Sequence, residues 1–273
     1  MEIGFSTRRF ANQRLTPHIL DQIHQAGIDR FEIFAARQHL DYRDSNHLRD
    51  VAEWFKSNRV SLNSVHGPLF SGLDGGRSAG SALSLSHTEK RLRIESMDET
   101  KRAMDAAEHL RFRYFVVHLG RHEDEYDLRR FDAGFTSLEH LRIFGKERGV
   151  DLLLENATGG LNTPDRVLQF IHYTRLEMRV CFDVGHAHLT GGVRPSLDLL
   201  KPLVATVHLH DNRQEKDDHL MPFEGSIDWQ GAMGGLHTLG DSIPGLLELQ
   251  DHGPPAGEME RIPEVIRKMN AAG

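Results

Sequence analysis

The chain has 273 residues, which fits one closed α/β barrel, a fold that uses about 250. Its formal net charge of −7 gives no general electrostatic attraction to nucleic acid, and no apolar run is long enough to cross a bilayer. Hydrophobic residues make up 38% and aromatic residues only 7%, so we expect an aliphatic core. The single cysteine, Cys181, cannot form an internal disulfide, and we expect it to fill the core of a reduced, cytoplasmic protein.

Short apolar runs alternate with amphipathic segments along the whole chain, a pattern typical of repeated βα units around a parallel sheet. We predict eight strands, at 2–6, 30–35, 61–66, 113–119, 151–156, 179–184, 205–210 and 244–250. Helix-like segments lie between them, at 16–26, 45–58, 88–110, 124–148 and 162–175, with a last helix near 257–271. No linker or composition break divides the chain, so we predict a single (β/α)8 TIM-barrel domain over residues 1–273.

A stretch rich in Gly and Ser, residues 69–87, follows the third predicted strand. It would lie on the C-terminal rim of the barrel, where substrate-binding loops occur. A functional lid and a plain flexible insert are both compatible with its composition.

Six consecutive predicted strands, the third to the eighth, end on or near a side chain that can bind a metal ion. The residues concerned are His66, His118, Glu155, Asp183 with His186 three positions later, His208 and Glu248. All strand ends of one barrel meet at the same mouth, so residues far apart in the sequence become neighbours. A separate structural reason accounts well for one such residue and poorly for six in a row.

Charge strengthens the case for metal. Glu155, Asp183 and Glu248 lie in apolar runs, and no Lys or Arg stands at these strand ends to neutralise them. Crowded carboxylates in such surroundings repel one another and take up protons unless a cation is bound. Mixed histidine and carboxylate ligands suit Zn²⁺ or Mn²⁺ better than Ca²⁺ or Mg²⁺.

The loop after the seventh strand, KDDHLMPFEGSIDW (216–229), adds two more candidates. Asp217 and His219 are two positions apart and would face the same way in an extended loop, with Asp218 pointing outward into solvent. The candidates then number nine, too many for one tetrahedral or five-coordinate ion. Two or three ions bridged by carboxylates would use them all.

Four fragments resemble a known family, the xylose isomerase-like TIM barrels, which include the endonuclease IV group (AP endonuclease family 2). They are LLLENATGG, CFDVGHAHLTGG, TVHLHDN and DDHLMPFEGSIDW, and they occur in the family's order. Endonuclease IV binds three zinc ions through nine side chains. The resemblance implies that the matching positions here are His66, His118, Glu155, Asp183, His186, His208, Asp217, His219 and Glu248.

Sugar isomerases and epimerases of the same superfamily use one ion. The resemblance implies that its ligands would be Glu155, Asp183, His208 and Glu248, with the two glutamates also acting as acid and base. The first two strand ends, GFSTRRF and FEIFAARQHLDYRD, resemble proteins described as sugar phosphate isomerase/epimerase more than the DNA-repair enzymes.

Two catalytic hypotheses therefore stand beside a third, a metal-stabilised binding protein. The first is a metal-dependent hydrolase of a phosphate ester or phosphodiester, with up to three Zn²⁺ ions and with Glu155 bridging ions and orienting the nucleophile. The second is a sugar (phosphate) isomerase or epimerase with one Mn²⁺-like ion and with Glu155 and Glu248 moving the proton. A small phosphate ester or sugar is the expected partner, and nucleic acid is less favoured. Further substrate-contact candidates, each with a structural role as the alternative, are Glu32, Arg37, His210, Arg213 and Trp229.

Overall fold

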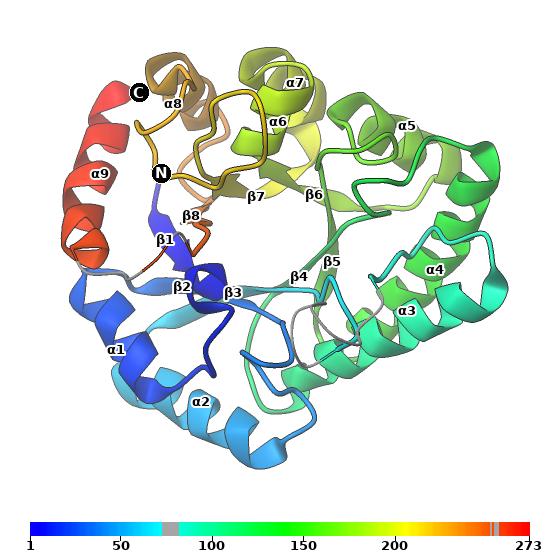
Figure 1. Cartoon of the computed structure of the whole chain (residues 1–273), viewed down its shortest axis with the longest axis horizontal. Helices are drawn as coiled ribbons and strands as arrows, with labels where there is room; N and C mark the ends of the chain where they lie inside the picture. Colours follow the sequence, from blue (N-terminus) through cyan, green and yellow to red (C-terminus); the bar gives the residue numbers. More distant parts are fainter. Residues whose placement is uncertain (73–81, 252, 254–256) are drawn as a thin grey trace.

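Eight parallel strands close into a barrel in the order β1 to β8, and helices surround it (Figure 1). This computed structural model describes residues 1–72, 82–251, 253 and 257–273, so residues 73–81 of the expected rim loop lie outside the described part. The strands are β1 (Ile3–Ser6), β2 (Arg30–Phe34), β3 (Ser61–His66), β4 (Tyr114–Val117), β5 (Asp151–Glu155), β6 (Arg179–Asp183), β7 (Val204–Leu209) and β8 (Gly245–Leu247). The predicted closed barrel and all eight predicted strands are confirmed.

The helices of the described chain begin and end close to the predicted positions wherever a helix was predicted. They are α1 (Pro17–Gln25), α2 (Ser45–Asn58), α3 (Lys90–Met104), α4 (Leu128–Lys146), α5 (Pro164–Thr174), α6 (Val184–Thr190), α7 (Val193–Leu200), α8 (Trp229–His237) and α9 (Glu258–Ala272). The segment predicted over 88–110 divides into α3 and a 3-10 turn, Asp105–Glu108.

The helices α6, α7 and α8 were not located from the sequence. The prediction extended the sixth strand through Val184, but the Asp183 side chain accepts a hydrogen bond from the His186 N–H and starts α6 at that point. In α8, three of nine residues are glycine, which lowers intrinsic helix propensity. Its burial against the barrel, through Trp229, Met233 and Leu236, stabilises a helix that propensity alone does not indicate.

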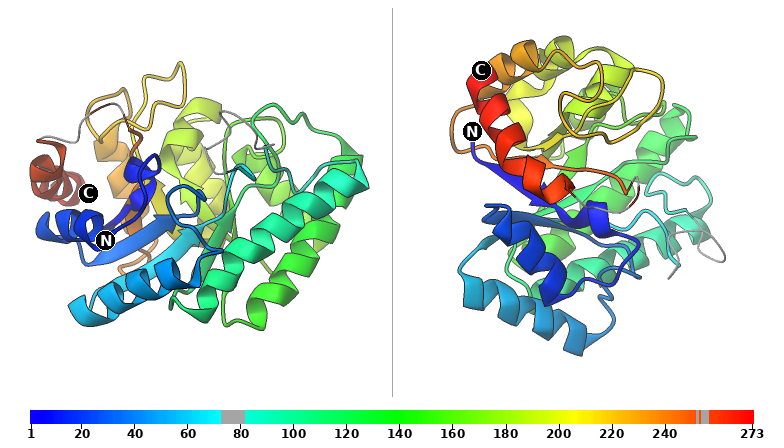
Figure 2. Two further views of the ribbon diagram at one scale, coloured as in Figure 1. Left: turned by 60° about the horizontal axis from the view of Figure 1, so that its bottom comes forward. Right: turned by 60° about the vertical axis from the view of Figure 1, so that its left-hand side comes forward.

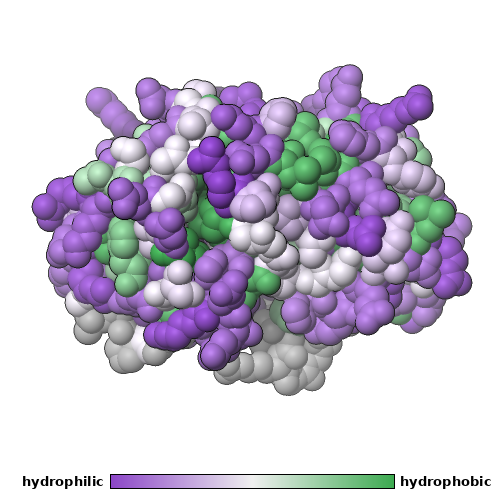
Figure 3. All heavy atoms as spheres, turned by 90° about the horizontal axis from the view of Figure 1, so that it is seen from above, coloured by the Kyte–Doolittle hydropathy of each residue, from purple (hydrophilic) through white to green (hydrophobic). Residues whose placement is uncertain are grey.

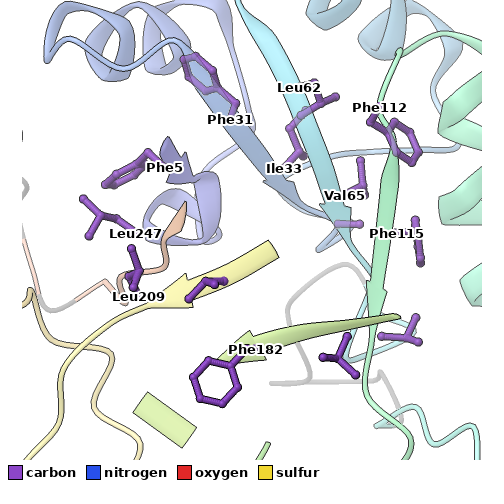
Figure 4. Close-up of a cluster of buried hydrophobic side chains, with 14 of the residues drawn as sticks. Phe5, Phe31, Ile33, Leu62, Val65, Phe112, Phe115, Phe182, Leu209 and Leu247 are labelled. Atoms are coloured by element: carbon purple, nitrogen blue, oxygen red, sulfur yellow. The ribbon is translucent and has the colours of Figure 1, made fainter. Parts of the chain in front are cut away.

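Alternation along the strands separates two hydrophobic layers. Inward-facing residues form a small cluster on the barrel axis, consisting of Tyr114, Val116, Leu153, Cys181 and Ala205. Other buried strand residues, including Phe31, Val65 and Phe115, belong to the large cluster between barrel and helices (Figure 4). The apolar plug occupies one level of the barrel interior, and the polar residues of the mouth lie above it.

Polar side chains cover most of the face drawn in Figure 3, and hydrophobic residues appear there only as small separate patches. The first strand and the last helix lie side by side, so the two ends of the chain are on the same side of the molecule (Figures 1 and 2). Among the described residues, no helix has the length and apolar character that crossing a bilayer requires.

A buried histidine in the loop after β2 generates a prediction about acid stability. His39 is fully buried, with Nδ1 at 2.6 Å from the carbonyl oxygen of Gln13 and Nε2 at 2.9 Å from Thr7 Oγ1. Thr7 Oγ1 accepts the Phe34 N–H, so its own proton is free to be donated to Nε2, which suits a neutral ring. Burial lowers the pKa of His39 from 6.5 to about 4.

The neutral ring contributes stability at pH values above 6.5 that is lost as the pH falls from 6.5 toward 4, because only the unfolded state takes up the proton in that window. We expect His39→Gln to have a shallower loss of unfolding free energy between pH 7 and pH 4, by up to about 3 kcal/mol. Urea denaturation of wild type and variant at several pH values measures this. Equal slopes for the two proteins would contradict the assignment.

Candidate metal centre

The structure brings all nine predicted ligand residues together at the mouth of the barrel. His66, Glu155 and Asp183 are the last residues of β3, β5 and β6, and His208 lies near the end of β7. His118 and Glu248 follow directly after β4 and β8, one residue beyond the regular strand. The remaining three lie in α6 and in the loop between β7 and α8. They are His186, Asp217 and His219.

Glu155 joins two groups of these residues, which we call the first group and the second group. In the first group, Glu155 Oε2 lies 3.2 Å from His66 Nε2 and 3.1 Å from His118 Nε2. In the second group, His208 Nδ1 lies 3.1 Å from Glu155 Oε1, 3.4 Å from Glu248 Oε2 and 3.8 Å from Asp183 Oδ2. Because each oxygen of Glu155 belongs to a different group, this side chain connects the two groups and could serve both.

A third group forms around Asp217. Its Oδ2 atom lies 3.1 Å from the Nε2 atoms of both His186 and His219. His210 is also close enough to these three side chains to be counted with them by distance alone. The third group therefore combines a helix residue with two residues of the long loop after β7.

The tautomers of four histidines leave a free lone pair inside the cluster. His66, His186 and His219 place Nδ1 within 2.8, 3.1 and 2.8 Å of the carbonyl oxygens of Gly67, Asn156 and Glu248. A carbonyl oxygen only accepts, so Nδ1 carries the proton and Nε2 faces inward unprotonated in the neutral ring. His208 is reversed, because its Nε2 lies 3.1 Å from Glu32 Oε2 and its Nδ1 faces inward.

Neutral imidazole nitrogens and carboxylate oxygens therefore face one another as acceptors, and a cation between them would satisfy both. A metal–ligand length of about 2.0–2.1 Å puts neighbouring tetrahedral ligand atoms about 3.3 Å apart. The spacings of 3.1 to 3.4 Å around Glu155, His208 and Asp217 match that value. Glu248 Oε1 and Asp217 Oδ1 are buried and have no hydrogen-bond partner among the described residues, as expected of oxygens that await a cation.

The pKa values of His186 and Glu155 show that the cluster stabilises positive charge on its histidines and negative charge on its carboxylates. Burial opposes ionisation of His186, but the carboxylates of Asp183 and Asp217 raise its pKa well above the ordinary value. Burial likewise would raise the pKa of Glu155, yet the imidazoles of His208 and His118 hold it well below the ordinary range. A proton and a metal ion would compete for the same histidine nitrogens, because a histidine binds a metal ion only in its neutral form.

The loop after β7 is held in place by one buried carboxylate. Asp211 accepts hydrogen bonds from the backbone N–H groups of Phe223 and Ile227 and from the indole N–H of Trp229. Asp211 and Leu220 also pair as an isolated bridge. Within the loop, His219 has a φ of 44°, a left-handed conformation that is uncommon for residues other than glycine. The fixed loop thus holds His219 in position against Asp217.

Several candidate residues other than the nine predicted ligands do not lie where the sequence predicted them. Asp218, expected to be solvated, is 5% exposed and lies 3.1 Å from Nζ of the exposed Lys216. Trp229 is buried against Asp211 and does not line the cavity above the cluster. Arg213 points outward with 60% of its side chain exposed.

Two other candidates lie near the cluster. Glu32 is completely buried within the barrel beneath His208, not at the mouth. Arg37 lines a second cavity beside the first, and the two cavities share Arg8, Leu69 and Phe70. Of the substrate-contact candidates, only Arg37 therefore lines a cavity beside the cluster. His210 is completely buried against the Asp183 carboxylate.

One residue of the site was missed from the sequence. Arg8 follows β1 at the C-terminal mouth, and its guanidinium lies 3.7 Å from Glu248 Oε1. It lines the cavity of about 240 Å³ above the cluster, together with Leu69, Phe70 and Arg121. Its place immediately after the first predicted strand was the available signal, since every strand end of a barrel faces the same mouth.

Cys181 lies in the apolar plug beneath the cluster and is fully buried, as predicted. Burial raises the pKa of its thiol well above the ordinary value, so it is not poised as a nucleophile.

The chain belongs to the xylose isomerase-like TIM barrel family, whose model matches residues 20–269. An uncharacterized protein of Methanocaldococcus jannaschii is 25% identical over 252 residues, which cover 88% of this chain and 80% of that protein. A probable endonuclease 4 of Haloquadratum walsbyi is 29% identical over 178 residues, covering 58% of this chain and 63% of the other.

Two solved structures share the fold over nearly the whole chain. A D-tagatose 3-epimerase-like protein has a TM-score of 0.78 at 22% identity and covers 99% of both chains. The IolI protein, solved with a bound zinc atom, has a TM-score of 0.76 at 18% identity and covers 100% of this chain and 96% of its own. The two solved structures thus share the fold of this chain, and a probable endonuclease 4 is among its sequence relatives.

The geometry predicts a stabilisation by zinc that depends on Glu155. Because the folded protein presents preformed ligand groups, Zn²⁺ at one hundred times its dissociation constant adds about 2.7 kcal/mol of stability per site. We expect the melting temperature of chelator-treated protein to rise on adding Zn²⁺, and Glu155→Gln to lose most of that rise because Glu155 belongs to two groups. Differential scanning fluorimetry measures this.

Glu99→Gln is the matched control for that experiment. Glu99 is also buried, but it pairs with Tyr42, Arg43 and Arg102 away from the barrel mouth. An equal loss of the zinc effect in both variants would contradict the assignment.

Proposed function

We propose that this protein is a divalent-metal-dependent hydrolase of a phosphate ester or phosphodiester, with about three ions bound by the nine residues of the three groups. The observation that carries the proposal is that the first and third groups each bring together three side chains that could hold an ion, beside the four of the second group. A single ion in the second group would have no use for His66 and His118 or for the Asp217 and His219 pair. Yet His66 and His219 each donate the Nδ1 proton to a backbone carbonyl oxygen, which orients the ring as in metal-binding histidines.

Charge balance supports several ions and an anionic substrate. Five buried or half-buried carboxylates belong to the cluster or touch it, namely Glu32, Glu155, Asp183, Asp217 and Glu248. Arg8 is the guanidinium in contact with them. With neutral histidines, one divalent ion leaves the cluster negative, two bring it to neutrality, and a third gives it a positive charge. A site with three ions therefore attracts a phosphate, whereas a site with one ion repels it.

Bound divalent ions lower the pKa of water and stabilise the charge that develops in a phosphoryl displacement. Glu155, which belongs to both the first and the second group, would help to hold the ions and would orient the attacking water. Arg8, close to Glu248 and facing the cavity, donates to an oxygen of the anionic substrate. Glu248 fixes Arg8 from below and, through its backbone carbonyl, His219.

Zinc fits this donor set best. Five histidines and four carboxylates make a mixed nitrogen and oxygen set with inner-atom spacings near those of tetrahedral zinc, and the nearby thiol of Cys181 belongs to the apolar cluster beneath them. Manganese is the alternative ion, because it accepts the same ligands at higher coordination.

A sugar epimerase or isomerase is the second candidate. The observation that favours it is the second group itself, which offers three carboxylates and one histidine around one position, with Glu155 and Glu248 both next to His208 Nδ1. In that reaction the two glutamates would remove and return a proton at a sugar carbon. Structural neighbours that are epimerases lend it support at the level of the fold.

Two variants separate the candidates. We expect zinc-loaded protein to cleave an activated phosphodiester, and His66→Ala and His219→Ala each to reduce kcat by at least about a hundredfold, the usual cost of one lost electrostatic contact in a transition state. An epimerase would keep ketose turnover in at least one of the two variants, because neither residue belongs to the second group. Assays of a phosphodiester, a phosphomonoester, a duplex with an abasic site and a panel of ketoses measure both outcomes.

His172→Ala is the control, because His172 lies exposed on α5 away from the mouth. Ketose epimerisation by wild type, unchanged in His66→Ala, would contradict the hydrolase and establish the second candidate.

A further inference from the structure

Two buried residues outside the nine contact the ligands of the second group from behind. Glu32 and His210 are both completely shielded from solvent. Glu32 Oε2 accepts hydrogen bonds from His208 Nε2 at 3.1 Å and from Ser64 Oγ at 2.7 Å. His210 Nε2 lies 3.1 Å from both carboxylate oxygens of Asp183.

We propose that Glu32 and His210 are positioning residues that give the second group the highest metal affinity of the three groups. Glu32 fixes the tautomer and the ring orientation of His208, and His210 fixes the carboxylate of Asp183. This inference rests on the proposed function, because it takes the second group to be a metal site.

Glu32 acts through the far nitrogen of His208. Its carboxylate accepts the Nε2 proton, so the lone pair of Nδ1 faces Glu155 and Glu248. Ser64, two residues before the ligand His66, holds the same carboxylate oxygen from the neighbouring strand. A carboxylate that accepts the outer proton of a ligand histidine both fixes the ring and increases the basicity of its inner nitrogen.

The other ligand histidines with a fixed tautomer use weaker acceptors. His66, His186 and His219 donate their outer protons to backbone carbonyl oxygens. Hydrogen bonds to charged groups are roughly twice as strong as those between neutral groups. The second group therefore has the best-oriented histidine, and we expect it to bind its ion before the first and third groups do.

His210 has two possible roles, and ring geometry separates them. By distance alone it could be a fourth ligand of the third group. However, its ring stacks on that of His219, with the centroids 3.7 Å apart and the planes 17° from parallel. An imidazole binds an ion along its own plane, so two nearly parallel stacked rings cannot both point a lone pair at one ion.

The hydrogen-bond partner of the His210 side chain is the Asp183 carboxylate, whereas Asp217 Oδ1 is farther away, at 4.0 Å from Nε2. Because Nε2 lies between two oxygen acceptors, it carries the proton and donates to Asp183. Gly185 makes this placement possible, since a Cβ atom there would lie 2.0 Å from His210 Cε1. His210 thus acts on the ion through Asp183, which is also the N-cap of α6.

The test for Glu32 compares Glu32→Gln with Glu99→Gln, which makes the same change in a buried carboxylate outside the barrel mouth. Zn²⁺ is titrated into chelator-treated full-length protein in competition with a chromophoric chelator. We expect Glu32→Gln to weaken the tightest binding event by about 10–100-fold, the usual effect of losing such a partner, and Glu99→Gln to leave it unchanged. Equal affinities in the two variants would overturn the role of Glu32.

If Glu32→Gln does not fold, Ser64→Ala takes its place. This variant keeps the carboxylate and removes one of the two groups that hold it. A smaller weakening of the same binding event supports the role, and unchanged affinity contradicts it.

The test for His210 compares His210→Gln with His39→Gln, a fully buried histidine without contact to the nine residues. We expect about a tenfold weakening of the tightest event in His210→Gln, an unchanged number of ions, and an altered d–d spectrum in the Co²⁺-substituted protein. Gly185→Ala, which displaces the same ring, should change the spectrum in the same direction. Loss of one whole ion would instead make His210 a ligand, and unchanged affinity and spectrum would remove its role.

Failure of this inference differs from failure of the proposed function. If wild type binds no Zn²⁺ with an affinity above that of a surface site, the metal centre itself is wrong. If wild type binds it tightly and Glu32→Gln and His210→Gln bind it equally well, only the positioning roles are wrong.

Discussion

The mouth of this barrel is organised around one electrostatic constraint, that acceptor atoms face acceptor atoms with no donor between them. Carboxylate oxygens of Glu155, Asp217 and Glu248 lie about one tetrahedral edge from imidazole nitrogens whose protons are engaged on the far side of each ring. Such a cluster is unfavourable without positive charge between the atoms, because the lone pairs repel and water is largely excluded. Buried contacts elsewhere in the fold keep the cluster together despite this repulsion, and a bound cation would remove the repulsion.

The rest of the structure follows from the need to hold these groups in place. The apolar plug closes the barrel below them, and rigid strand ends present the first and second groups from above it. The third group depends on a loop, and Asp211 ties that loop to the barrel through three hydrogen bonds across it. Behind the second group, Glu32 contacts His208 and His210 contacts Asp183, so these two buried residues support the ligands from within the barrel.

The strands and the meeting of the nine candidate residues at the mouth were predictable, because both leave a strong local signal. Strands of a parallel barrel are buried on both sides and appear as short apolar runs, and a His or Glu that ends such a run, as in His66 or Glu155, stands out. The closure of eight such runs then places their ends together without further information. The helix α8 was not predictable in this way, because its glycines oppose a helix and only its packing on the barrel stabilises it.

The roles of residues that depend on a neighbour in space could not be predicted from the sequence either. Glu32 has the pattern of an inward-facing residue, but nothing local shows that His208, 176 positions away, will meet it. The alternation of an extended chain predicts that Asp218 points into solvent, but its side chain is buried in the folded loop. Arg8 stands shortly after the first predicted strand, but its role at the site is shown only by its proximity to Glu248.

Metal content tests the central claim most directly. The full chain, purified without chelator and in the presence of Zn²⁺, is analysed by elemental mass spectrometry against protein concentration from amino-acid analysis. The account predicts close to three ions per chain, one for each of the three groups, since each group brings together at least three side chains that could hold an ion. A value of one ion per chain, unchanged by His66→Ala or His219→Ala, would contradict it.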